Sequence, residues 1–381
     1  MDINDLPEDQ KLVAARLVLK LSGLKLNSRF SHVTAGPVVT TYYFQLGFDI
    51  PISKILNKAE DFALAAGVDS VIIQRSADKI AIEIPNASRQ VVNFHNCLYQ
   101  MMTSHTGRAM TIPVLLGVDT YGNNSYLDLA EQPHILIAGS TGGGKSILLS
   151  SIIGAMATAK SEKEIKLTLV DTKRLDLPLF KSLPHIGAMC ENSEQFHSRL
   201  DYLFATVRKR AEQLQGVARN AREYNNMGHK DFMEYHVIII DELADLMDQD
   251  SGRRSVDPEY AIKWPTVPVR LKALTQICRA AGVHIIAATQ RSSVKVINGD
   301  IKANFPTRIA LRLPTAVDSK TILSTKGAES LLGKGDMLVE SLDSDMARRF
   351  HGAFVSNNDI TNILSAASQI REQLLSLPEV N

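Results

Sequence analysis

The sequence predicts an α/β protein in which helices cover both faces of a mostly parallel sheet, preceded by a smaller α+β domain. After about residue 107, five short apolar segments alternate with helical stretches, and the first leads directly into a glycine-rich segment at residues 139–146. Such alternation is typical of βα units, and a glycine-rich loop between a strand and a helix is typical of phosphate binding. A chain of 381 residues is also longer than one core usually holds. We therefore expect two domains, at residues 1–107 and 108–381.

The apolar segments of the second domain indicate strands. Residues 237–240, Val-Ile-Ile-Ile, are continuously apolar, as strands are when helices cover both faces of a parallel sheet. One such run alone also fits a buried helix, but five runs bounded by turn or polar residues favour a sheet. The expected strands are 134–138, 166–170, 236–240, 284–288 and 307–313.

The first domain mixes both periodicities. Its apolar spacing predicts helices and strands in alternation, followed by a connector with weak signals. The helices are expected at 12–26 and 52–66, the strands at 33–45, 71–73 and 80–84, and the connector at 90–108.

Bulk composition limits the possible partners and compartments. The formal net charge is +1, so any nucleic-acid binding requires a local basic patch. The three cysteines, Cys97, Cys190 and Cys278, form no CxxC pair, which argues against a zinc site and a disulfide framework. The N-terminus lacks the features of a signal peptide, and no run of 18 apolar residues occurs. We expect a soluble cytoplasmic protein with no membrane span.

The glycine-rich segment has the complete GxxxxGKS spacing of a phosphate-binding loop. Glycines let the backbone N–H groups turn toward phosphates, and the helix that follows adds positive potential at its N-terminus. A lysine and a serine at its end can reach the β- and γ-phosphates and Mg²⁺. A chance glycine-rich turn is the alternative, which the flanking strand and helix disfavour. The expected ATP-binding residues are Gly139, Ser140, Thr141, Gly142, Gly143, Gly144, Lys145, Ser146 and Ile147, with Ser146 also a Mg²⁺ ligand.

Polar residues at the ends of two later strands complete the expected site. Asp241 follows an apolar strand and can hold Mg²⁺ through its water shell, and Glu242 can activate the attacking water. Gln290 follows the next strand and can sense the γ-phosphate. Solvated acids and a satisfied amide at strand ends are the alternatives. Arg279 precedes that strand, and composition alone favours an ordinary surface arginine there.

Several further motifs of the chain are long and unusual. Together with the phosphate-binding loop, they are residues 36–40 (GPVVT), 65–71 (AAGVDSV), 84–86 (IPN), 171–173 (DTK), 183–185 (LPH), 241–247 (DELADLM), 279–284 (RAAGVH), 288–291 (ATQR), 301–310 (IKANFPTRIA) and 335–338 (GDML). In sequence and in order, these motifs resemble the motor of the FtsK/SpoIIIE family of double-stranded DNA translocases, over about residues 36–355.

The resemblance implies a hexameric ring in which a small α-domain precedes a RecA-like P-loop domain, with ATP between subunits. It implies that Arg279 acts on a neighbouring subunit's ATP and that Gln290 is the sensor. It also implies that Arg291 and Lys320 line the pore, where both would contact DNA phosphates without reading sequence. For Lys320, an ordinary surface cation is the alternative.

The chain departs from the family pattern at four places. Ala316 stands where the motors usually carry a further basic residue, so we expect the contacts to DNA to be weaker or to be shared differently among residues. Residues 248–269 are an additional polar stretch, expected to be an inserted exposed loop. Members of the family have N-terminal membrane spans, and we expect none in this chain. The tail is expected to be one helix at 360–377, too short for the winged-helix module of the family.

We therefore predict an ATPase that moves double-stranded DNA through a homohexameric ring, with ATP and Mg²⁺ as cofactors and no membrane partner. One alternative is a related ring ATPase for conjugative transfer, packaging or single-stranded DNA. The other is an ATP-assembled DNA-binding scaffold with little turnover.

Overall fold

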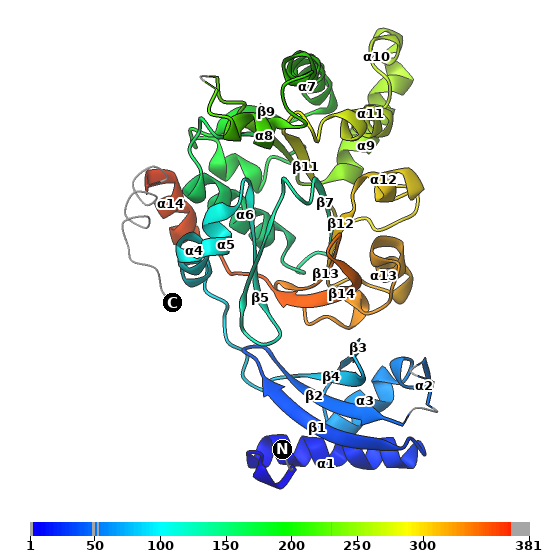
Figure 1. Ribbon diagram of the computed structural model, residues 1–381. Helices are drawn as coiled ribbons and strands as arrows, with labels where there is room; N and C mark the ends of the chain where they lie inside the picture. Colours follow the sequence, from blue (N-terminus) through cyan, green and yellow to red (C-terminus); the bar gives the residue numbers. More distant parts are fainter. Residues whose placement is uncertain (1–2, 48–49, 52, 230, 367–381) are drawn as a thin grey trace. The chain divides into compact units, whose positions relative to one another are not determined.

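The computed structural model describes residues 3–47, 50–51, 53–229 and 231–366 (Figure 1). The chain forms two compact units. The smaller comprises Met1–Val92, Val118–Asn123 and Ser330–Leu332, and the larger comprises Asn93–Gly117, Asn124–Glu329 and Gly333–Asn381.

The smaller unit contains an antiparallel sheet with strand order β1-β2-β4-β3. Our expectation of one strand at 33–45 is wrong, because the chain turns back at Gly36. Its N–H donates to the carbonyl of Val39 (2.9 Å) and closes a hairpin. A Cβ at Gly36 would lie 2.0 Å from the carbonyl oxygen of Thr120, so only glycine fits this turn. The strands are β1 (Ser28–Ala35), β2 (Val39–Leu46), β3 (Ile72–Ser76) and β4 (Lys79–Pro85).

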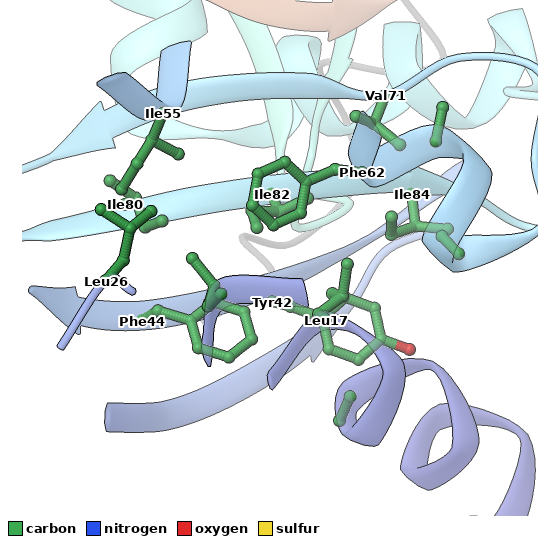
Figure 2. Close-up of a cluster of buried hydrophobic side chains, with 14 of the residues drawn as sticks. Leu17, Leu26, Tyr42, Phe44, Ile55, Phe62, Val71, Ile80, Ile82 and Ile84 are labelled. Atoms are coloured by element: carbon green, nitrogen blue, oxygen red, sulfur yellow. The ribbon is translucent and has the colours of Figure 1, made fainter. Parts of the chain in front are cut away.

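Helices α1 (Glu8–Gly23), α2 (Ser53–Leu56) and α3 (Ala59–Ala66) pack on this sheet. They confirm the two helical segments predicted from the apolar spacing, the second as two pieces. Figure 2 shows Leu17 and Phe62 in one apolar cluster with Phe44 and Ile82 of the sheet, and all four side chains are fully buried. Their burial supplies the main favourable term for folding this unit.

The larger unit is built on a ten-stranded sheet with order β6-β5-β14-β13-β12-β7-β11-β10-β8-β9. The six strands from β12 to β9 run parallel, and β13 is antiparallel to both of its neighbours, β12 and β14. All five predicted strands are present, so the mostly parallel sheet is confirmed. The strands are β5 (Pro113–Asp119), β6 (Asn124–Asp128), β7 (His134–Ala138), β8 (Ile165–Val170), β9 (Ile186–Cys190), β10 (Tyr235–Ile240), β11 (Val283–Thr289), β12 (Thr307–Leu311), β13 (Asp336–Ser341) and β14 (Ser344–His351).

Helices cover both faces of this sheet. Figure 1 shows α4, α6 and α14 on one side and α9, α11, α12 and α13 on the other. Helix α6 is buried almost all round. Its Gly154 lies so close to Phe94 and Ile363 that a Cβ there would approach both within 3.0 Å. The helices are α4 (Phe94–Thr103), α5 (His105–Ala109), α6 (Lys145–Ala159), α7 (Ser193–Leu214), α8 (Ala221–Asn226), α9 (Leu243–Val256), α10 (Pro258–Lys263), α11 (Val267–Ile277), α12 (Gly299–Asn304), α13 (Ala316–Leu323) and α14 (Asn357–Ala366).

The expected connector at 90–108 is helical instead. Asn93 accepts the N–H of Asn96 and caps α4, and Phe94, Leu98 and Met101 are buried. Because α4 packs against α6 of the larger unit, the chain passes between units at Val92–Asn93 rather than near residue 107.

The expected exposed loop at 248–269 is also helical, in the end of α9, α10 and the start of α11. Many of its polar side chains are exposed, but Asp250 and Tyr260 are buried in a hydrogen-bond network. Asp250 accepts bonds from the Tyr260 hydroxyl (2.9 Å) and the Val267 N–H (3.0 Å), and it pairs with His197 of α7 (2.9 Å). Fully bonded buried carboxylates of this kind are indistinguishable from loop residues by composition.

Within the described residues, no helix is both long and apolar enough to cross a bilayer. The tail helix expected at 360–377 is seen as α14 up to Ala366, and the remainder of that prediction lies outside the described residues.

Replacing Phe62 by alanine should destabilise the protein by about 3–5 kcal/mol, because the side chain is fully buried and leaves a cavity. Leu64 lies on the same helix but is 82% exposed, so Leu64→Ala should change stability by no more than about 0.5 kcal/mol. Urea unfolding of both variants measures the difference. Equal losses would contradict the packing described for α3.

Candidate nucleotide-binding site

The glycine-rich loop joins the end of β7 to the start of α6. Gly142 and Gly144 have φ values of +79° and +108°, which side chains rarely allow. A second turn backs the loop, because the N–H of Gly335 donates to the carbonyl of Gly143 (2.8 Å). A Cβ on Gly144 would meet that Gly335 nitrogen at 2.5 Å. The glycines therefore permit both the curvature of the loop and its close contact with the 333–335 turn.

Lys145 begins α6 and forms a buried ion pair with Asp241, at the end of β10. Its ammonium lies 2.7 Å from the Asp241 carboxylate and also donates to the Asp241 carbonyl. Burial raises the pKa of the Asp241 carboxyl, Lys145 beside it opposes this rise, and Asp171 and Asp176 add to it. The ammonium group of Lys145 is therefore one positive charge beside three acids, Asp241, Asp171 and Asp176.

Sequence reasoning missed two of those acids as site residues. Asp171 follows β8 and accepts backbone N–H groups from residues 173–177, which fixes the turn after this strand. That turn carries Asp176, whose carboxylate accepts the hydroxyl proton of Ser146. The sequence does carry a pattern that indicates Asp171. An aspartate directly follows both β8 and β10, and these strands pair in parallel, so Asp171 and Asp241 lie at the same edge of the sheet. Asp176 lies six residues beyond the end of β8, and only the folded turn brings it to Ser146.

Glu242 is buried and is held by the residues at the end of β11. Thr289 donates its hydroxyl to one Glu242 oxygen (2.6 Å), and the N–H of Gln290 donates to the other (2.9 Å). The Gln290 side chain also accepts the hydroxyl proton of Thr141 in the glycine-rich loop (3.2 Å). The ends of β7, β10 and β11 are therefore linked by side-chain hydrogen bonds.

The residues present suit Mg²⁺ bound together with a nucleotide. Asp241, Asp176 and Ser146 offer the oxygen ligands that Mg²⁺ prefers, and the raised pKa of Asp241 marks negative charge that a cation would stabilise. In the described part of the chain, no group of three or more His, Cys, Asp or Glu side chains could hold a metal by itself. Such incompleteness fits Mg²⁺, which usually keeps several waters and substrate phosphates as ligands.

The other predicted residues lie apart from this cluster. Arg279 precedes β11 and Gln290 follows it, so the seven-residue strand separates the two by roughly 20 Å. The Arg279 guanidinium is exposed and donates weakly to the carbonyl of Glu131 (3.4 Å). Lys320 is exposed on α13. Arg291 directly follows Gln290 and pairs with Asp245 and Asp248 of α9.

Comparison with known families agrees with this geometry. The model of the FtsK/SpoIIIE family matches residues 98–294, and that of the FtsK alpha domain matches residues 3–86. The chain belongs to the FtsK/SpoIIIE family. It is a P-loop ATPase, with the P-loop at residues 139–146.

Curated relatives extend the match along the chain. The DNA translocase FtsK of Staphylococcus aureus (strain Mu50) is 34% identical over 361 residues, which cover 91% of this chain and 43% of that protein. The DNA translocase FtsK of Lactiplantibacillus plantarum is 33% identical over 364 residues, covering 92% and 44%. The chain therefore spans less than half the length of these relatives.

Solved structures confirm the RecA-like P-loop fold. The monomer of the pCW3 conjugation coupling protein TcpA superposes with a TM-score of 0.64 at 23% identity, covering 93% of this chain and 99% of that one. The cytoplasmic domain of the type VII secretion ATPase EccC of Thermomonospora curvata gives a TM-score of 0.58 at 22% identity, covering 77% and 35%. At these identities the likeness concerns the fold alone.

The Gly144→Ala variant should be less stable than Gly142→Ala. Both positions have positive φ, which costs an alanine about 1–2 kcal/mol. A Cβ at Gly142 meets nothing within 4 Å, whereas one at Gly144 strikes the backbone of Gly335 and should cost roughly 1–3 kcal/mol more. Denaturant unfolding without nucleotide measures the difference, and indistinguishable variants would show that the 333–335 turn does not back the loop.

Proposed function

We propose that this chain is the motor part of a double-stranded DNA translocase, which hydrolyses ATP as a hexameric ring. One observation carries the proposal. Thr289 and Gln290 bond to Glu242, Gln290 also bonds to the P-loop, and the next residue is the exposed cation Arg291. A single segment therefore joins the nucleotide site to a position suited to DNA phosphates.

In this proposal each residue of the cluster has one role. The P-loop amides and Lys145 bind the phosphates of ATP, which requires Lys145 to exchange part of its bonding to Asp241 for phosphate oxygens. Ser146 and Asp241 hold Mg²⁺, which when bound neutralises charge on the β- and γ-phosphates. Glu242 accepts a proton from the attacking water, and Gln290 senses the γ-phosphate. Residues 139–147 line the phosphate site.

The position of Arg279 in the sheet favours an oligomer. It lies at the amino-terminal edge of the sheet, whereas the P-loop lies at the carboxyl-terminal edge, so it is badly placed to act on its own subunit's ATP. A guanidinium from a neighbour can stabilise the charge of the transferred phosphoryl group. An exposed arginine with one weak hydrogen bond is free to make that contact without breaking a stable interaction. A closed ring would give every subunit such a neighbour.

Arg291 and Lys320 are the proposed DNA contacts. Both are exposed cations, and contacts to phosphates would hold a duplex without reading its sequence. Ala316 begins α13 without a charge, which leaves Lys320 as the basic side chain of that helix. Since the fold is shared with a conjugation coupling protein and a secretion ATPase, the polymer moved by the ring has to be identified by experiment.

Linear duplex DNA should stimulate the ATPase several-fold, and single strands of the same length should not. The stimulation should weaken steeply as salt rises, because phosphate contacts release bound counterions. Steady-state ATP turnover, with the mass of the assembly measured in parallel, tests this. Stimulation by single strands alone would favour the alternative motors, and a salt-independent response would contradict phosphate contacts.

Glu242→Gln is the control for this measurement. It keeps the size of the side chain and removes its basicity, so ATP binding should persist while turnover is lost. Retained biological function in this variant would favour the ATP-assembled scaffold over the motor.

Arg279→Ala and Lys145→Ala should each lower turnover by about 10³-fold or more, as loss of an arginine finger does. Mixing the two variants should restore activity, because an Arg279→Ala subunit keeps an intact P-loop that a Lys145→Ala neighbour can complete. With random assembly, about a quarter of the interfaces would be complete. A mixture no more active than its separate components would mean that Arg279 does not act across an interface.

A further inference from the structure

Arg291 is bound by two acids of α9, the helix that begins directly after Glu242. Its guanidinium donates to the Asp248 carboxylate and lies 3.4 Å from that of Asp245. The Arg291 and Asp248 side chains are 56% and 59% exposed. Exposed ion pairs contribute little to stability, so a polyanion can displace these carboxylates from Arg291.

The backbone before Arg291 is tied to Glu242. The N–H of Arg291 donates to the Thr289 hydroxyl (3.1 Å), and that hydroxyl donates to Glu242 (2.6 Å). The N–H of Gln290 occupies the second Glu242 oxygen (2.9 Å). Both oxygens of the proposed base are thus engaged by the residues that lead to Arg291.

Helix α9 connects Glu242 with the two acids that bind Arg291. Glu242 is the N-cap residue of α9, Asp245 lies in its first turn, and Asp248 follows one turn later. Asp245 is itself fixed by an ion pair with Lys173 (2.9 Å), in the turn that Asp171 caps. Asp245 therefore has a fixed position beside Arg291, and the backbone N–H of Arg291 is bonded to the same Thr289 hydroxyl that donates to Glu242.

We propose that Asp248, assisted by Asp245, occupies on Arg291 the place of a DNA backbone phosphate. Exchange of this carboxylate for a phosphate draws Arg291 from α9 and loosens the hold of Thr289 and Gln290 on Glu242. A Glu242 oxygen released from its donor is free to accept a hydrogen bond from the attacking water and orient it, so DNA contact raises turnover. This inference rests on the proposed function and concerns the regulation of the same site.

Asp248→Asn tests the exchange. It removes the competing charge and keeps the size of the side chain, so the ATPase rate without DNA should rise about two- to fivefold, the range an exposed ion pair can supply. The duplex concentration that gives half-maximal stimulation should fall by a similar factor. Glu194→Gln is the matched control, because Glu194 pairs with the partly exposed Arg253 near the opposite end of α9 (2.6 Å). It makes the same charge change and should resemble the wild type.

Thr289→Val tests the second step. It removes the hydroxyl that binds Glu242 while keeping the shape, and it should raise the DNA-free rate, whereas Thr289→Ser should not. An Asp248→Asn variant that matches Glu194→Gln in both quantities overturns the exchange. A Thr289→Val variant that matches Thr289→Ser overturns the link to Glu242. Wild-type stimulation by duplex separates these outcomes from failure of the proposed function, which would show no stimulation in any variant.

Discussion

The site depends on the parallel hydrogen-bonded register of four neighbouring strands. Ile240 of β10 pairs with Val170 of β8 and Ala287 of β11, and Thr289 of β11 pairs with Ala138 of β7. These pairs bring the carboxyl ends of the four strands to one edge of the sheet, where ligands bind in open α/β folds. A shift of one residue in any pair would turn the following side chains to the opposite face. The chemistry of the site is therefore positioned by backbone hydrogen bonds far more than by the site residues themselves.

The buried ion pair of Lys145 and Asp241 has a high desolvation free energy. Both side chains are at least nine-tenths buried, and removing two charges from water costs more than a typical buried ion pair returns. Two further acids, Asp171 and Asp176, raise the cost by repelling Asp241. An apolar pair would fill the same space with less desolvation, so stability does not account for these charges. A phosphate and a divalent cation, which would bind the lysine and the acids respectively, account for them physically.

The segment at 248–269 illustrates how polar residues can belong to a core. Tyr260, Trp264 and Asp250 are buried between α7 and the helices α9 to α11. The indole N–H of Trp264 donates to Asp201 (2.9 Å), and Arg270 donates to the carbonyl of His197 (3.0 Å). Since unpaired buried groups are destabilising, each bond in this network constrains the others. These bonds fix the segment to α7, and its first part belongs to α9, the helix that carries Asp245 in its first turn.

Local sequence was sufficient to predict five neighbouring strands of the sheet, β7, β8, β10, β11 and β12, and the glycine-rich loop after β7. Both depend on short-range patterns, namely continuous apolar runs and a fixed glycine spacing, that act through backbone conformation. Local sequence did not determine the hairpin at Gly36, the helices α4 and α10, or the acid at Asp176. In each case the deciding contact comes from residues distant in the chain: the Thr120 carbonyl, the packing on α6 and α7, and the Ser146 hydroxyl. Tertiary structure alone decided these features, because burial and hydrogen bonding between distant segments outweigh the weak preferences of short ones.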